Sequence, residues 1–121
     1  MSAEEVINTL CLTPHPSGCS GWFRQTFASP TLVNTPAGER HASTAVYFLQ
    51  KFGQKSPFHR QRSDEVFHFY QGVPLSLYWI DQEGAMNKVV LGQDISKGQL
   101  PQVGVYYTIT PSYKPYHPTR Q

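Results

Sequence analysis

The residues whose types and spacing could carry chemistry lie between His59 and Gly72. Glu65 follows His59 by six residues, and the polar cluster Arg62-Ser63-Asp64 between them is typical of a turn. This spacing predicts two strands folded back on each other, one bringing an imidazole and the other a carboxylate. The pair could transfer protons. It could also form half of a metal site, but only half, because Gln61 adds an amide, which is a poor ligand beside imidazole and carboxylate.

The surroundings of Glu65 follow from the alternation of side chains along a strand. If Glu65 faces the interior, Phe67 and Phe69 face it too, and Val66, His68 and Tyr70 point outward. His68 is then an outward-facing or dimer-contact histidine. The expected pocket combines one acid, one imidazole and one amide with aromatic walls, which suits a small, partly apolar ligand. The neighbouring strands are expected to add Tyr47 or Phe48 and Tyr78 or Trp79.

Each of these residues also has a structural interpretation. His59 could donate a hydrogen bond to a loop carbonyl at the rim, and the aromatic side chains could simply be core. Glu65 is harder to explain in this way, because a buried carboxylate is costly unless it is paired, protonated or bound to a cation. Arg24 and Arg60 are the candidate partners.

The rest of the chain is typical of an all-β protein. Ser2 and Glu5 form a capping box before a short N-terminal helix, expected within residues 1–12. Regular short strands separated by Gly and Pro turns indicate a sandwich or barrel in one domain over 1–121, with a Pro- and Tyr-rich tail over 111–121. The expected strands, rich in β-branched and aromatic residues, are 22–27, 42–52, 65–70, 75–81, 87–92 and 103–110.

Several short motifs follow one another in a recognisable order. They are HPSGC (15–19), RQT (24–26), STAVYFL (43–49), SPFHR (56–60), SDEVFHFYQGVPL (63–75), LGQD (91–94) and GQLPQ (98–102). In this respect the chain resembles a small single-domain branch of the cupin superfamily of largely unassigned function. The resemblance covers roughly residues 6–105 and implies a jelly-roll-like β-barrel. It also implies that His59, Gln61 and Glu65 occupy the first metal-binding motif of cupins, with Gln61 in the place of a histidine.

The chain departs from this family at two places. Ser17 and Cys19 stand where the family has Glu and Gly, and the sequence after Gln102 differs from the family's Val-Pro-Gly-Trp run and closing strands. No candidate stands at the place of the third cupin histidine, since His117 lies in the Pro-rich tail. An open barrel edge would need cover. We therefore expect a homodimer in which an N-terminal strand or the strand over 103–110 pairs across subunits, or a tail that folds back as a lid.

Three classes of function fit these residues. The first is an enzyme without a tightly bound metal, an isomerase, epimerase, cyclase or lyase in which His59 and Glu65 are the catalytic acid and base. The second is a metal-dependent dioxygenase or decarboxylase, with weak divalent-metal binding at His59 and Glu65, and the third is a barrel that binds a small molecule without catalysis. The expected substrate-binding residues are Gln61, Phe67, Phe69, Tyr47, Trp79 and Arg24.

Composition and charge exclude other classes. The formal charge is only +2 over 121 residues, and the basic residues are scattered except around the turn near Arg60, so nucleic-acid binding is not expected. No apolar span or signal peptide is recognisable, which predicts a cytoplasmic protein without membrane contact. Cys11 and Cys19, without a denser cysteine pattern, are expected to be free thiols.

Overall fold

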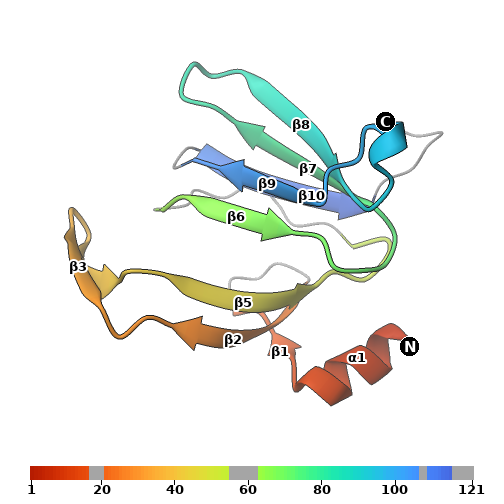
Figure 1. Cartoon of the computed structure of the whole chain (residues 1–121), viewed down its shortest axis with the longest axis horizontal. Coiled ribbons are helices and arrows are strands. Elements are labelled where there is room, and N and C mark those ends of the chain that lie inside the picture. The colour runs from red at the N-terminus through yellow and green to blue at the C-terminus, as the bar shows by residue number, and fades with distance from the viewer. Residues whose placement is uncertain (17–20, 55–62, 107–108, 116–121) are drawn as a thin grey trace. The chain divides into compact units, whose positions relative to one another are not determined.

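A computed structural model describes residues 1–16, 21–54 and 63–106, together with the backbone of 109–115. This part of the chain is built of antiparallel strands and one short α-helix, which confirms the predicted all-β class (Figure 1). In chain order the elements are α1 (Ala3–Leu10), β1 (Thr13–Pro14), β2 (Trp22–Ala28), β3 (Leu32–Thr35), β4 (Gly38–His41), β5 (Thr44–Leu49), β6 (Glu65–His68), β7 (Leu75–Ile80), β8 (Met86–Leu91), the 3-10 turn η1 (Ile95–Lys97), β9 (Gln102–Val105) and β10 (Ile109–Pro115).

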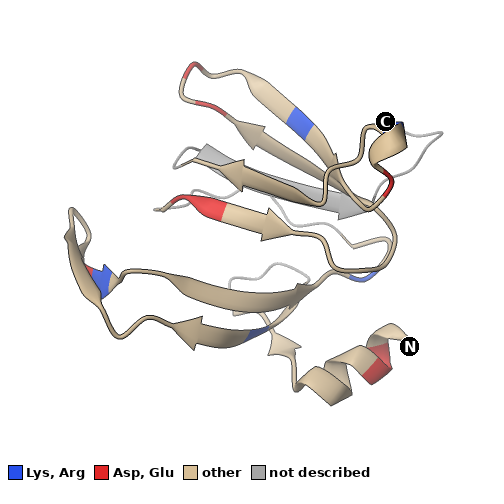
Figure 2. Ribbon diagram, viewed as in Figure 1, with Lys and Arg blue, Asp and Glu red and all other residues tan. Residues whose placement is uncertain are grey.

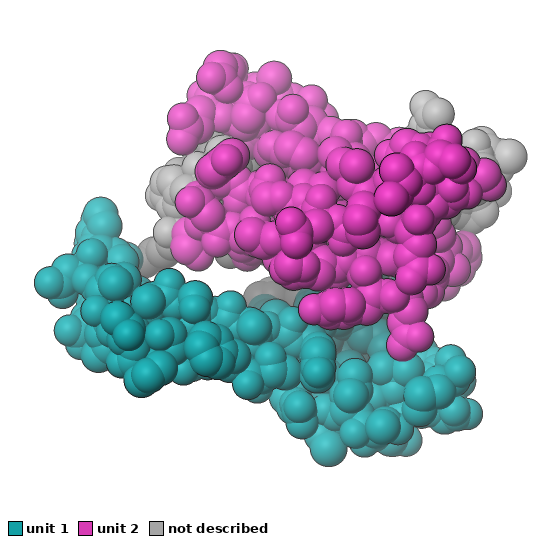
Figure 3. All heavy atoms as spheres, in the orientation of Figure 1, with its two compact units in different colours: residues 1–51 teal, residues 52–121 magenta. Residues whose placement is uncertain are grey.

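The chain forms two compact units, Met1–Lys51 and Phe52–Gln121 (Figure 3). The first unit contains α1, a three-stranded sheet of order β1-β2-β5 and the two-stranded hairpin β3-β4. The second contains a three-stranded sheet of order β10-β7-β8 and the two-stranded pair β6-β9. Each strand of these sheets runs antiparallel to its hydrogen-bonded neighbours, so every strand can expose one face to a core.

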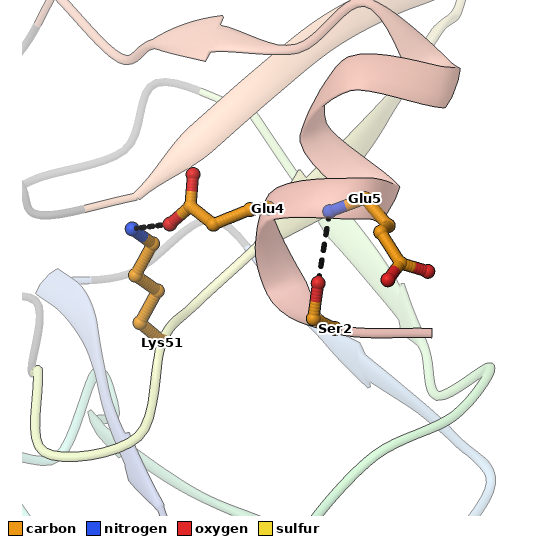
Figure 4. Close-up of polar contacts among 4 residues, drawn as sticks. All are labelled: Ser2, Glu4, Glu5 and Lys51. Carbon is orange, nitrogen blue, oxygen red and sulfur yellow. Dashed lines mark hydrogen bonds and ion pairs between the residues drawn. The ribbon is translucent and has the colours of Figure 1, made fainter.

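The N-terminal helix begins where its capping residue predicts. The Ser2 hydroxyl accepts a hydrogen bond from the Glu5 backbone N–H at 3.1 Å, which satisfies one of the free donors of the first turn (Figure 4). The helix ends at Leu10, because Cys11 adopts the left-handed conformation at φ 57° and its N–H bonds back to Asn8. Glu4 also forms an ion pair with Lys51 at 2.5 Å, so the helix is tied to the end of β5.

The core of the second unit is a small apolar cluster. Leu77, Leu91 and Val105 are at most 4% exposed and come from β7, β8 and β9. Partly buried apolar side chains pack around this cluster: Phe67, Phe69, Leu75, Trp79, Val89 and Val103. The contact removes the inward faces of four strands from water, which is the main favourable term in folding this unit.

The C-terminal part differs from the prediction. The single strand expected over 103–110 is two strands, β9 paired with β6 and β10 paired with β7, and β10 extends into the expected tail. The register of β10 shifts between Ile109 and Ser112, so the bulge contains Pro111. Proline is tolerated because β10 is at the edge of its sheet, where one side of the strand needs no hydrogen bonds. Both strands pair within the chain through one edge, and pairing of the segment 103–110 across subunits stays a prediction.

The other strands were predicted within a few residues of their ends, except for β1, β3 and β4, which were not predicted. No strand was expected over 32–41, where residues 35–38 form the turn that connects β3 and β4 in a hairpin. Thr35 stabilises the turn, because its hydroxyl donates to Gly38 O at 2.6 Å and accepts from Ala37 N at 3.2 Å.

Two of the short motifs form one structural unit after β8. The buried Gln99 side chain accepts a hydrogen bond from Asp94 N at 3.1 Å, and Gln99 N donates to Asp94 O at 3.2 Å. Gly92 lies against this amide: a Cβ at Gly92 would be 2.2 Å from Gln99 Oε1 and 2.9 Å from Gln99 Cδ. The LGQD and GQLPQ segments therefore hold each other in place, and Gly92 makes the close approach possible.

We predict that Gly92→Ala destabilises the protein by about 1 to 3 kcal/mol, because the added methyl group must displace a buried amide from its donor. Urea unfolding followed by circular dichroism measures the change. Gly104→Ala is the matched control, since a Cβ there has no atom within 4 Å. In a Gln99→Ala background the Gly92→Ala change should cost less, because the clashing atoms are gone. Equal effects of the two glycine substitutions would contradict this role of Gly92.

Candidate functional site

Glu65 is the first residue of β6 and lies on the inward face of that strand. It pairs with Val105 of β9, and the burial of the segment alternates as expected. Glu65, Phe67 and Phe69 are half-buried, and the residues between them are exposed. The carboxylate thus lies at the end of an apolar face that continues into the core, and Figure 2 shows this acidic position at the start of β6. This agrees with the alternation read from the sequence.

Three of the aromatic residues expected to line a pocket pack against the core. Phe67, Phe69 and Trp79 all pack against Leu77, Leu91 and Val105. These rings can contact a ligand only through the parts that the core does not cover. The sequence did not indicate that β9 would supply the neighbouring apolar side chains, because the segment after Gln102 contains no recognisable motif.

His68 lies on the opposite face of β6. Its ring stacks on Tyr70 at 6.3 Å with an interplanar angle of 7°, and Gln102 Nε2 donates to its Nδ1 at 3.3 Å. Both neighbours belong to the outer face of the β6-β9 pair. His68 is therefore directed away from the face of Glu65, as the outward interpretation of this residue requires.

His59 and Gln61 lie outside the described residues, as does Arg60. The meeting of an imidazole, an amide and the Glu65 carboxylate therefore stays a prediction. Within the part of the chain that the structure describes, no three His, Cys, Asp or Glu side chains gather in a way that could hold a metal ion. Cys11 is an exposed free thiol, and Cys19 is outside the described residues.

Arg24 and Tyr47, both expected to bind substrate, lie together in the first unit. They are cross-strand partners on β2 and β5, and the guanidinium carbon of Arg24 is 5.7 Å from the centre of the Tyr47 ring. Trp22 lies two residues before Arg24 on β2, so the two side chains share a face. Lys51 Nζ is 5.4 Å from the centre of the Trp22 ring. The face therefore carries two cation–π pairs. The sequence indicated Arg24 and Tyr47 separately and did not reveal that they are neighbours.

A hollow of about 490 Å³ opens in the second unit, near the start of β6 and the turn that follows β7. Trp79 is the one predicted site residue that lines it. Carboxylates dominate the rest of its wall, and Figure 2 shows some of them in red at the β7-β8 turn. The other lining residues are Asp64, Asp81, Gln82, Glu83, Gly104 and Tyr106. Sequence reasoning treated the polar residues among these as parts of turns.

Asp81 organises the turn at the rim of this hollow. Its Oδ1 accepts hydrogen bonds from Glu83 N at 3.0 Å and Ala85 N at 2.9 Å, and its Oδ2 accepts one from Asn87 Nδ2 at 2.9 Å. The Asn87 amide, followed by the Ala85 backbone N–H, lowers the pKa of Asp81 below its ordinary value. The carboxylate is therefore occupied in holding the hairpin and is a poor candidate for proton transfer.

The described antiparallel strands and the one short helix make this a small all-β protein. The chain belongs to the Cupin_5 family, described as Cupin superfamily (DUF985), whose model matches residues 4–110. Two solved structures are similar to it, each at 30% identity. A hypothetical protein from Leishmania major has a TM-score of 0.85, and the match covers 94% of this chain and 70% of that protein. A Shewanella oneidensis protein solved by X-ray crystallography has a TM-score of 0.83, and the match covers 97% of this chain and 71% of that protein.

No protein of curated function matches the chain. In the part that the structure describes, no helix has the length and apolarity that crossing a membrane would require.

We predict that Asp81→Asn lowers the free energy of unfolding at pH 7 and makes that free energy less dependent on pH in the acid range. The pKa of Asp81 is lower in the folded state, so its contribution is present above the unfolded pKa and is lost as the pH falls through the folded pKa. Thermal unfolding between about pH 5 and pH 2 tests this. Glu39→Gln, an exposed carboxylate on β4, is the control. A pH profile for Asp81→Asn identical to the wild-type profile would contradict it.

Proposed function

We propose that this protein is a cupin-type enzyme that acts on a small molecule without a tightly bound metal, as an isomerase, epimerase, cyclase or lyase. The observation that supports this most is the position of Glu65, a half-buried carboxylate on the same face as Phe67 and Phe69. Removing a carboxylate from water is costly, and a protein that only needed a core would place an apolar residue there. In this proposal Glu65 is the catalytic base.

The chemistry needs only a proton carrier on each side of the substrate. Glu65 takes a proton from carbon or oxygen of the substrate, the electron pair moves into the neighbouring bond, and a protonated His59 returns a proton at a second atom. Before the next turnover Glu65 releases its proton to solvent and His59 takes one up from solvent, so the protons balance and nothing is oxidised or reduced.

A binding barrel without catalysis is the second candidate. It is supported by the hollow beside Trp79, whose volume of about 490 Å³ lies in the range of small-molecule sites. Its wall of Asp64, Asp81 and Glu83 would favour a cationic ligand over an anionic one. The two candidates differ in whether Glu65 performs chemistry, so the activity of a Glu65 variant separates them.

The proposed enzyme is a cytoplasmic homodimer. The exposed free thiol of Cys11 supports the location, because thiols persist in a reducing compartment. The strand edges of the first unit that have no partner among the described residues support the homodimer, because such edges in a β protein invite a further strand.

Metal content distinguishes this enzyme from a metal-dependent dioxygenase or decarboxylase. We expect less than about one-tenth of an equivalent of iron, nickel, manganese or zinc in protein purified without chelator, since Gln61 offers an amide where a stronger ligand is needed. Elemental analysis by mass spectrometry measures this. A transition metal present at one equivalent, and lost in Glu65→Gln, would replace the proposed function with the metal-dependent one.

Proton transfer to carbon can be detected without knowing the substrate. We expect wild-type protein, incubated in D₂O with the small-molecule fraction of a cell extract, to add one deuterium to a metabolite. Glu65→Gln should slow this by about 10²- to 10⁴-fold, the usual contribution of a general base. Glu39→Gln is the control, an exposed carboxylate on β4 that does not line the hollow. Deuterium incorporation by Glu65→Gln at the wild-type rate would contradict the assignment of the base.

A further inference from the structure

The hairpin β3-β4 continues the β2-β5 ladder, since Ser29 N donates to Ser43 O and Ala42 N donates to Thr31 O, but no third described strand flanks it. Seven of its eight strand residues are exposed, including Leu32 and Val33 at 48% and 42%. Among the described strands none pairs with either of its outer edges. The part of a ladder that has only two strands gains less stability than a part with three or more. The hairpin is nonetheless regular, with four residue pairs in one register.

The hydrogen-bond pattern shows which backbone groups are open on β3. Ala42 N donates to Thr31 O at 2.8 Å, which makes Thr31 and Ala42 a hydrogen-bonded pair next to the hairpin. Such pairs alternate along an antiparallel ladder, so Val33 and Thr35 direct their backbone groups toward β4. The N–H and C=O groups of Leu32 and Asn34 therefore point to the outer edge.

Within its four residues, β3 has no charge, proline or bulge to protect this edge, although Pro30 and Pro36 bound the strand on either side. The residues Leu32–Thr35 carry no charge and no proline, and Figure 2 shows the charges of the hairpin on β4 instead. By contrast, the edge strand β10 contains Pro111, Pro115 and a bulge. Charges, prolines and bulges are the common means of preventing strand addition. β3 is open to a further strand.

We propose that a second copy of this chain binds along the outer edge of β3, antiparallel to it, with the twofold axis at Val33. In this pairing Leu32 forms a hydrogen-bonded pair with the partner's Asn34, and Asn34 forms one with the partner's Leu32. Val33 faces the partner's Val33 as the non-hydrogen-bonded pair between them, where side chains come closest. The two hairpins then form one four-stranded sheet.

Two prolines select this register. Moving the axis to Leu32 would place Asn34 opposite the partner's Pro30, and moving it to Asn34 would place Leu32 opposite the partner's Pro36. Proline has no N–H, so each shift loses hydrogen bonds at both ends of the pairing. Only the axis at Val33 gives every open N–H and C=O group of Leu32 and Asn34 a partner.

The outer edge of β4 is a poor alternative for the same contact. Its open groups belong to Glu39 and His41, so an axis at Arg40 would place two arginines opposite each other, and an axis at Glu39 two glutamates. Like charges directly opposite in a sheet are destabilising. The uncharged edge of β3 carries no such penalty.

This inference rests on the homodimer of the proposed function and specifies its contact. Cysteine cross-linking tests the register. Val33→Cys should form a reducible covalent dimer under a mild added oxidant, because the two positions face each other at a separation that a disulfide can span. Asn34→Cys is the matched control: it is equally exposed, carries the same native cysteines and faces the partner's Leu32 instead of itself. Equal cross-linking of the two variants would overturn the register.

A charge at the axis tests the contact without a covalent bond. Val33→Lys, at an exposed position, should raise the dissociation constant of the dimer by about tenfold or more in sedimentation equilibrium, because it opposes two like charges, while leaving the thermal unfolding of the monomer unchanged. Wild-type protein that is monomeric at micromolar concentration would overturn both this contact and the homodimer. A wild-type dimer that Val33→Lys leaves intact would overturn the β3 contact alone and direct attention to another edge, such as that of β5.

Discussion

The packing of four strands around Leu77, Leu91 and Val105 is the constraint on which the candidate site depends. Because side chains alternate along β6, burying Phe67 and Phe69 in this cluster directs Glu65 to the same side and His68 to the other. A one-residue slip of β6 against β9 would exchange the two, placing an imidazole inside and the carboxylate in water. The apolar contacts of Phe67 and Phe69 therefore fix the side of β6 on which the carboxylate lies.

Much of this could be predicted from the sequence. The alternation over Glu65, Phe67 and Phe69 is a local pattern with a strong apolar signal, and the order of the short motifs is enough to indicate the cupin family to which the chain belongs. The N-terminal cap was equally local, since Ser2 and Glu5 are three residues apart. Features of this kind depend on neighbours in the chain, so one sequence is enough to reveal them.

The remainder depends on contacts between distant residues or on segments without an apolar pattern. The hairpin β3-β4 is exposed on both faces, so no period of two marks it, and β10 contains two prolines that argue against a strand. The proximity of Arg24 to Tyr47 and of Gly92 to Gln99 follows from strand register and loop packing. Such contacts cannot be read from neighbouring residues in one sequence. His59 and Gln61 lie outside the described residues, so their place in the site remains a prediction.

The place of β10 in its sheet has a consequence for the order of folding. β7 meets β8 through a turn that joins Ile80 to Met86, but it meets β10 through a pairing of Ile80 with Ile109, 29 residues along the chain. Local hairpins close quickly, and long-range pairings wait on chain entropy and, in the cell, on synthesis. One side of β7 therefore stays unpaired on a ribosome for seconds after the hairpin exists, and the time window for misassembly of this sheet is set by the rate of translation.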